Sequence, residues 1–296
     1  MTYAISPITR QYSRPYLQLA EFKAAPTALD YGNLVAGGTQ AQQDAELTNA
    51  ITRASSWIDQ YCNQIIGATL DVEQQRVRVR PDGTIRFHPK YFPVVALQAF
   101  SYGFVPNQMT VVPDVSSAWI EEQEIIFPYA QINSSMSSQG PLGFGAPSSS
   151  RAEAFIKYTY INGYANTILA ANASAGATSI TVAEGTGIIA GEMLNIYDGS
   201  SSERIVVDAS YSFGSTTVPL AAPLAYAHTA GVSISNLPAA VKEAAILVTS
   251  AYLKIRGDAS LTMGVTNAVP SVTNDSRIAT DVEHSQELLK PFRRIR

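Results

Sequence analysis

Residues 44–66 read DAELTNAITRASSWIDQYCNQII, and this stretch decides most of the fold prediction. Its apolar residues recur at intervals of three and four, so in a helix they share one face. They are Leu47, Ile51, Ala54, Ile58, Tyr61, Cys62 and Ile65. Asp44 and Glu46 fall in the first turn, where the helix dipole favours acidic side chains. The stretch therefore predicts one long amphipathic helix from about Asp44 to Ile66, with Gly67 as its stop.

Further helices are predicted near the other end of the chain. One starts after Leu237-Pro238, because proline suits the first helical position, and Gly257 caps it. A shorter helix is predicted from about Thr280 to Lys290, and Pro291 ends it. We expect the helices from both ends of the chain to pack on each other as one helical body.

Between these helices, residues 74–162 are typical of strands. RVRVR (76–80), PDG (81–83) and TIRFH (84–88) predict a hairpin with a three-residue loop. The register would pair Val79 with Ile85 and Val77 with Phe87 on one face. The other face would collect a basic stripe, consisting of Arg76, Arg78, Arg80, Arg86 and His88.

More strands are predicted at 94–100, 119–127 and 154–161, and residues 134–150 predict a mobile loop, since they are mostly Ser, Gly, Pro and Gln. Residues 164–236 predict an all-β segment, because short β-branched runs alternate there with Gly, Ser and Asp turns.

Composition sets limits on function. The 296 residues are 46% hydrophobic but only 15% charged, so much of the surface is uncharged or is covered by a partner. The net charge of −4 argues against a protein whose main task is to grip nucleic acid phosphates. Residues 164–236 contain five acidic residues and one basic residue, which accounts for the whole net charge. This shift in charge marks a candidate domain boundary on each side.

The sequence thus predicts an α+β fold. A helical bundle core, residues 1–70 and 237–296, would be joined to a β-hairpin and sheet part, residues 71–163, that contains the loop 134–150. Residues 164–236 would form an inserted all-β domain, barrel-like or sandwich-like, of a size that folds alone.

We find no residue pattern that would carry catalysis or hold a cofactor or metal. The three histidines lie in different predicted elements, and no zinc-binding, nucleophile-elbow or phosphate-loop spacing occurs. Cys62 is expected to be a small buried hydrophobe and His228 a turn or packing residue. Glu121, Glu122 and Glu124 are expected to form a solvated strand edge. No apolar run approaches the roughly 18 residues that a membrane-spanning helix needs. We therefore expect neither an enzyme nor a membrane protein.

Two basic features leave alternatives open. The basic stripe is either a solvated face or a surface for an acidic partner or for passing DNA, contacted without sequence reading. The end of the chain, Lys290 and Phe292-Arg293-Arg294-Ile295-Arg296, places an aromatic side chain beside three arginines. Because an exposed Phe292 would be unfavourable, we expect this segment to dock somewhere.

Six stretches together resemble the head-to-tail connector, or adaptor, proteins of tailed bacteriophages. They are YLQLAEFKAAP (16–26), DAEL through RASSWIDQYC (44–62), HPKYFPV (88–94), YTYINGY (158–164), LPAAVKEA through RGD (237–258) and LLKPF (288–292). The resemblance covers about residues 14–165 and 237–296. Small adaptors lack a domain such as residues 164–236, so that segment departs from the pattern.

The resemblance implies a virion protein at the head–tail junction, made in the bacterial host cytoplasm. Copies would form a ring, usually twelvefold, between the portal of the capsid and the next neck, stopper or tail protein. Genomic DNA would pass through the lumen without sequence-specific binding. The C-terminal segment, Lys290 and Phe292 to Arg296, would bind the portal. The family has no catalytic residues to carry over.

An alternative from another class also fits the sequence. Residues 164–236 and the low charge are compatible with a carbohydrate- or surface-binding β-module of a tail fibre or secreted structure.

Overall fold

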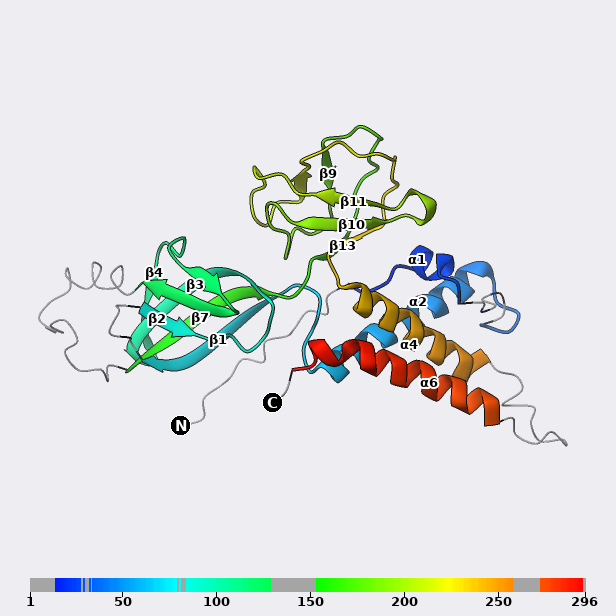
Figure 1. Ribbon diagram of the computed structural model, residues 1–296, viewed down its shortest axis with the longest axis horizontal. Coiled ribbons are helices and arrows are strands. Elements are labelled where there is room, and N and C mark those ends of the chain that lie inside the picture. The colour runs from blue at the N-terminus through cyan, green and yellow to red at the C-terminus, as the bar shows by residue number, and fades with distance from the viewer. Residues whose placement is uncertain are drawn as a thin grey trace, which may run out of the picture. The chain divides into compact units, whose positions relative to one another are not determined.

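The computed structural model describes residues 14–27, 29, 32, 34–78, 80, 84–128, 153–257 and 272–294. The chain divides into two compact units (Figure 1). The described part of the first unit lies within Ala68–Gly163, and the second unit combines Tyr12–Gly67 with Tyr164–Arg296. The predicted loop 134–150 lies outside the described residues.

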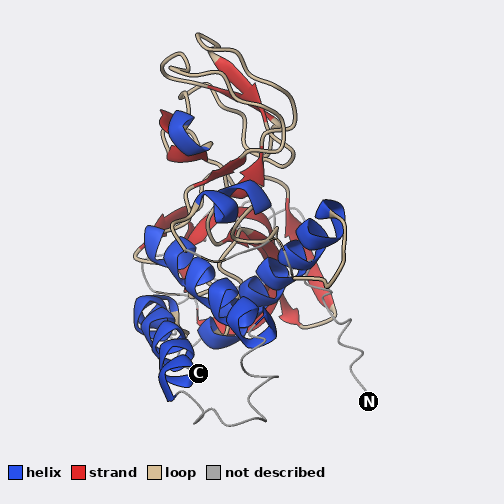
Figure 2. Ribbon diagram, turned by 90° about the vertical axis from the view of Figure 1, so that its right-hand side faces the viewer, coloured by secondary structure: helices blue, strands red, loops and turns tan. Residues whose placement is uncertain are grey.

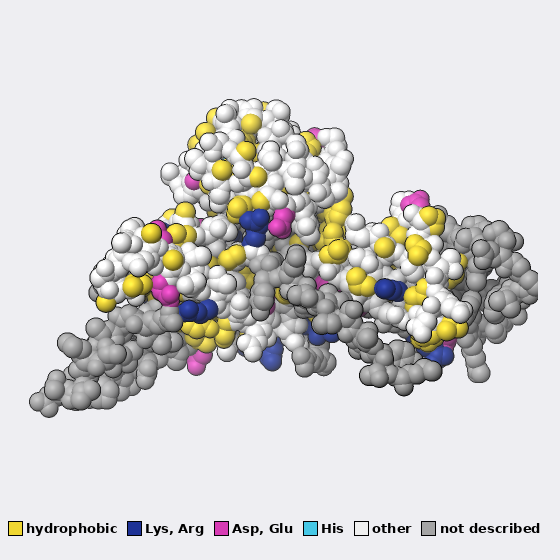
Figure 3. Space-filling model, turned by 180° about the vertical axis from the view of Figure 1, so that it is seen from behind, with side chains coloured by type: hydrophobic (Ala, Val, Ile, Leu, Met, Phe, Trp, Pro, Cys, Tyr) yellow, Lys and Arg dark blue, Asp and Glu magenta, His cyan; other side chains and the backbone are white. Residues whose placement is uncertain are grey.

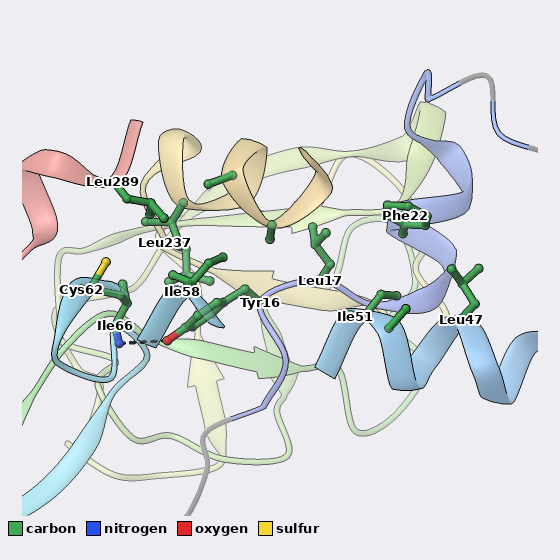
Figure 4. Close-up of a cluster of buried hydrophobic side chains, with 14 of the residues drawn as sticks. Tyr16, Leu17, Phe22, Leu47, Ile51, Ile58, Cys62, Ile66, Leu237 and Leu289 are labelled. Atoms are coloured by element: carbon green, nitrogen blue, oxygen red, sulfur yellow. Dashed lines mark hydrogen bonds between the residues drawn. The ribbon is translucent and has the colours of Figure 1, made fainter. Parts of the chain in front are cut away.

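The helices belong to the second unit and lie together in Figure 2. They are α1 (Leu19–Ala24), α2 (Gln40–Cys62), α4 (Ala239–Gly257), α6 (Val272–Leu289) and the 3-10 turn η2 (Lys290–Phe292). Their apolar faces meet in one buried cluster, part of which is drawn in Figure 4. The cluster includes Tyr16, Phe22, Leu47, Ile51, Ile58, Cys62, Leu237, Val241 and Leu289.

The bounds of α2 and α6 differ from the prediction. Helix α2 begins four residues early, where the Thr39 backbone N–H donates to Gln42 Oε1 at 2.8 Å. It ends at Cys62 rather than Ile66, because Asn63 adopts the left-handed conformation with φ of 57°. Asparagine tolerates this conformation, so no glycine is needed as the stop. Helix α6 begins at Val272, eight residues before the predicted Thr280.

The second unit also contains residues 164–236, here called the β module. Its strands are β8 (Asn166–Ile168), β9 (Ser179–Thr181), β10 (Met193–Tyr197), β11 (Glu203–Val206), β12 (Thr217–Pro219) and β13 (Ser233–Ser235), with the 3-10 turn η1 (Gly199–Ser201). They form an antiparallel sheet in the order β11-β10-β13-β8 and a β12-β9 pair. A buried cluster runs from Ala165 to Ile234 within the module. The ends of the module meet, since Asn236 N–H donates to Ala165 O at 3.1 Å.

The first unit is a β structure of two antiparallel sheets. Its strands are β1 (Thr69–Arg78), β2 (Thr84–Phe87), β3 (Val94–Val105), β4 (Gln108–Val112), β5 (Trp119–Glu121), β6 (Glu124–Pro128) and β7 (Glu153–Asn162). The sheets have the orders β1-β7-β3-β4 and β2-β6-β5. They share one core, in which Phe87 lies 4.5 Å from Tyr158 and Phe100 lies 4.6 Å from Phe127 between ring centroids.

The predicted hairpin register is confirmed at its turn, where Arg80 N–H donates to Thr84 O at 2.9 Å. Val79 and residues 81–83 lie outside the described residues. Away from the turn, β1 pairs with β7 and β2 pairs with β6, and no ladder joins β1 to β2 within the described residues. Val77, Ile85 and Phe87 are nevertheless all buried in the shared core. Alternation along a strand fixes its two faces, whereas its partner depends on chain far away. The predicted strand 119–127 is also divided, because Glu122 and Gln123 turn with positive φ.

The predicted fold class is wrong. Strands account for more of the described chain than helices, 35% against 27%, and form four antiparallel sheets, with no helical bundle as the core. The physical reason is that two of the three buried clusters consist of strand and loop residues. Helical periodicity located α2 and α4, but it did not indicate how many buried residues the strands would contribute in clusters of their own.

Candidate functional site

The C-terminal segment, of which residues 290–294 are described, lies against the end of α2. Arg294 N–H donates to Cys62 O at 2.9 Å, and Gln64 Nε2 donates to Phe292 O at 3.0 Å. Asn63 Nδ2 donates to Arg294 O at 3.4 Å. Because the last carbonyls of a helix have no partner within it, the segment supplies a hydrogen bond that α2 lacks.

The side chains of the segment also contact the same chain. Phe292 packs against the helical cluster and lies edge-on to Tyr164, with ring centroids 6.4 Å apart. The Arg293 guanidinium lies 5.3 Å from the centre of the Tyr61 ring. Lys290 Nζ pairs with Glu287 at 2.6 Å, and both of these side chains are largely exposed. The expectation that Phe292 docks is thus met within the chain itself. Ile295 and Arg296 lie outside the described residues.

Cys62 marks the centre of this contact. Burial raises the pKa of its thiol to about 12, and the charges of Asp59 and Arg293 act on the thiol in opposite directions. The thiol is buried, as the sequence predicted, so Cys62 contributes packing and a backbone carbonyl to the site.

All five residues of the basic stripe contact carboxylates. Arg76 and Arg78 pair with Glu153, the latter at 3.5 Å. Arg80, Arg86 and His88 each lie 3.8 to 3.9 Å from a carboxylate oxygen of Glu124. The stripe is therefore partly neutralised.

Glu124 and Glu153 are the residues that sequence reasoning missed. Glu124 was expected on a solvated edge, but its side chain is only 16% exposed beneath three basic groups. The signal was the alternation of β6, which places Glu124 on the face opposite Ile125. Glu153 carried no comparable signal, because it reaches the stripe only through the pairing of β7 with β1.

Most acidic side chains of the β module form hydrogen bonds or ion pairs with other residues of the module. His228 is fully buried, with Nδ1 2.9 Å from Asp198 Oδ2 and Nε2 2.8 Å from Glu203 Oε1. Glu203 also accepts hydrogen bonds from the backbone N–H groups of Ala225 and Tyr226. Burial pushes the pKa of Glu203 up, but these hydrogen bonds and the one from His228 outweigh it and hold the pKa below its ordinary value. His228 is thus the packing residue that the sequence predicted.

The buried Lys242 pairs with a second helix and also contacts the β module. Lys242 of α4 bonds both carboxylate oxygens of Glu21, at 2.9 and 3.0 Å, and lies 3.3 Å from Ser233 Oγ. Its ammonium also lies 4.1 Å from the centre of the Tyr197 ring. Burial lowers the pKa of Lys242, while the charge of Glu21 opposes that shift. A second contact is made by Asn166 Nδ2, which donates to the backbone carbonyl of Arg14 at 3.0 Å.

Charged side chains are sparse on the surface. On the face drawn in Figure 3 they lie singly or in small groups rather than in one patch. Among the described residues, no group of three or more His, Cys, Asp or Glu side chains is placed to hold a metal ion. No helix within the described ranges has the length and apolar character needed to cross a membrane.

Comparisons with known proteins identify no family. No protein-family model matches the chain, and no curated protein matches its sequence. Among solved structures, a chain described as "Neck of empty GTA particle computed with C6 symmetry" is similar at 10% sequence identity and a TM-score of 0.32. The similarity covers 95% of this chain and 94% of that chain. A TM-score this low does not establish a shared fold, and no family membership follows from it.

Proposed function

We propose that the protein is a structural, non-enzymatic virion protein. It would be a subunit of the head-to-tail adaptor ring that joins the portal of a capsid to the neck or tail. Its partners would be further copies of itself in a ring of about twelve, the portal protein, and the next neck, stopper or tail protein. DNA would pass through the lumen.

One observation supports the proposal: the stretches that resemble adaptor proteins pack on each other within each unit, four of them in the second and two in the first. Residues from 16–26, 44–62, 237–258 and 288–292 build one hydrophobic cluster. The other two stretches meet in the first unit, where Tyr91 N–H donates to Tyr160 OH at 3.1 Å and Gly163 N–H donates to Pro93 O at 2.8 Å. The stretches that carry the resemblance are therefore core-forming parts of the chain.

The surface supports subunit contacts. A protein with 15% charged residues has few charges to keep copies apart. Large apolar side chains are exposed in the first unit, among them Val105, Val111, Trp119 and Ile120. Exposed apolar surface of this kind is typical of protein interfaces.

The paired basic stripe also suits this role. Glu124 and Glu153 offset much of its charge, so the face would not hold DNA firmly. A channel that lets DNA slide needs such weak contacts, because each unpaired cation strengthens phosphate binding. Whether the stripe faces the lumen stays a prediction.

The test is assembly with the portal. The protein is mixed with the purified portal protein of the same particle, and complexes are viewed by electron microscopy and weighed by native mass spectrometry. We expect a ring seated on the portal. Deleting residues 291–296 should abolish attachment, while the chain should still fold without the contacts of Phe292 and Arg294 with the end of α2.

Two outcomes would contradict the proposal. One is a protein that stays monomeric with portal present. The other is glycan or cell-surface binding by the isolated β module, which would favour the alternative of a surface-binding protein.

A further inference from the structure

The C-terminal segment has two partners to consider, the end of α2 within the same chain and the portal. In the structure it is bound to the end of α2, through Cys62, Gln64 and Tyr164. Under the proposed function it is also the part that attaches the subunit to the portal. Residues 292–294 have one set of backbone groups, so a portal contact that uses them has to displace the contact with α2.

The contact with α2 is one that attachment to a partner could displace. Its hydrogen bond from Asn63 Nδ2 is long at 3.4 Å. Phe292 is only half-buried, and Arg293 lies over the Tyr61 ring. Pro291 falls within η2 between α6 and the segment, which gives the segment a defined exit from the helix.

We propose that this contact is autoinhibitory: in the free subunit it withholds the portal-binding segment, and it opens when the subunit attaches. The inference rests on the proposed function and adds a control step to it. A segment that is available only for a fraction of the time binds with an affinity reduced by that fraction. Free subunits would thus engage off-target surfaces less, and portal binding would select the open state.

A disulfide lock tests the proposal. Cys62 is the one cysteine of the chain, and the hydrogen bond from Arg294 N–H to its carbonyl brings the two main chains within reach of a disulfide. Arg293→Cys and Arg294→Cys are made singly, oxidised, and tested for portal binding before and after reduction. We expect a cross-link from at least one position, binding reduced by more than about tenfold when oxidised, and recovery on reduction.

Matched controls separate the lock from the substitution. Arg294→Ser and the pair Cys62→Ser with Arg294→Cys lack the disulfide, so the oxidant should leave their binding unchanged. A second variant, Asn63→Gly, removes the side-chain bond to Arg294 and keeps the left-handed conformation, which glycine adopts freely. It should bind the portal about twofold to fivefold more tightly than the wild type.

Because burial raises the pKa of the Cys62 thiol, oxidation is carried out at alkaline pH and the denatured chain is cross-linked alongside. Three outcomes would overturn the inference. A cross-link that forms in the denatured chain but from neither position in the folded chain means that the segment does not rest on α2. A locked protein that binds the portal as well as its reduced form means that the contact is not inhibitory, while the proposed function stands. A wild-type protein that never binds the portal removes the proposed function and the inference together.

Discussion

Lys242 shows how one side chain fixes the β module to the helices. It is buried on α4, pairs with both oxygens of Glu21 and lies over the Tyr197 ring. These partners come from α1 and β10, so Lys242 holds α4 to both of them. Removing one member of a buried pair is far more damaging than removing an exposed pair, because the other charge stays buried without a partner.

The Lys242→Met variant should therefore lose about 3 kcal/mol of the free energy of unfolding. Lys254→Met is the matched control, since Lys254 pairs with Asp281 at a more exposed place on α4 and should cost less than about 1 kcal/mol. Urea unfolding measures both. Equal losses of the free energy of unfolding in the two variants would contradict the prediction that the buried pair matters more than the exposed one.

We expect the stability of the β module to fall at acidic pH because of Glu203. Its pKa is held below the ordinary value, so its stabilisation is complete above the ordinary glutamate pKa and is lost as pH falls through the lowered value. Glu203→Gln should be less stable than the wild type at pH 7 and should lose less further stability on acidification. Glu243→Gln, at an exposed position of α4, should keep the wild-type decline. A decline in Glu203→Gln as steep as that of the wild type would contradict the prediction.

At the scale of elements, the sequence predicted faces and helix positions better than partners. Period-two alternation placed Val77, Ile85 and Phe87 correctly in the core, since it depends only on neighbours along the strand. It did not identify β7 as the partner of β1, because Arg76 and Phe155 meet across a long separation in the chain. The same holds for the candidate site. The sequence predicted that Phe292 would be docked, because an exposed phenylalanine next to three arginines is unfavourable. It did not predict the partner Gln64, which lies 228 residues away in the chain.

The basic stripe, which spans β1 and β2, gives a prediction of its own. Replacing Glu124 and Glu153 by Gln leaves its arginines without these partners, so affinity for duplex DNA should rise. The dependence of affinity on salt should steepen by up to about 2 logarithmic units per decade of salt, the effect of about two added phosphate contacts. Glu121→Gln on β5 is the control and should bind like the wild type. Titration of labelled DNA at several salt concentrations measures this, and an unchanged slope would contradict it.

At the scale of the whole molecule, the β module is an excursion from the helical part. Its first and last residues are joined by the bond from Asn236 N–H to Ala165 O, and it buries its own cluster. Replacing residues 166–235 by two glycines should leave a folded protein, because this bond already holds the ends of the excision together.

We expect this deletion variant to form the same ring as the full chain, as judged by native mass spectrometry. The full chain analysed alongside is the control. A folded deletion variant that stays monomeric would instead assign the module to the subunit contacts.

Because residues 165 and 236 are held next to each other, they are also a site at which another domain can be inserted. Any compact domain whose termini lie close together, such as a fluorescent protein, fits where the β module now stands without stretching the helical part. A particle assembled from such chains would carry one reporter per subunit, so the intensity of a single particle would count the copies around the neck.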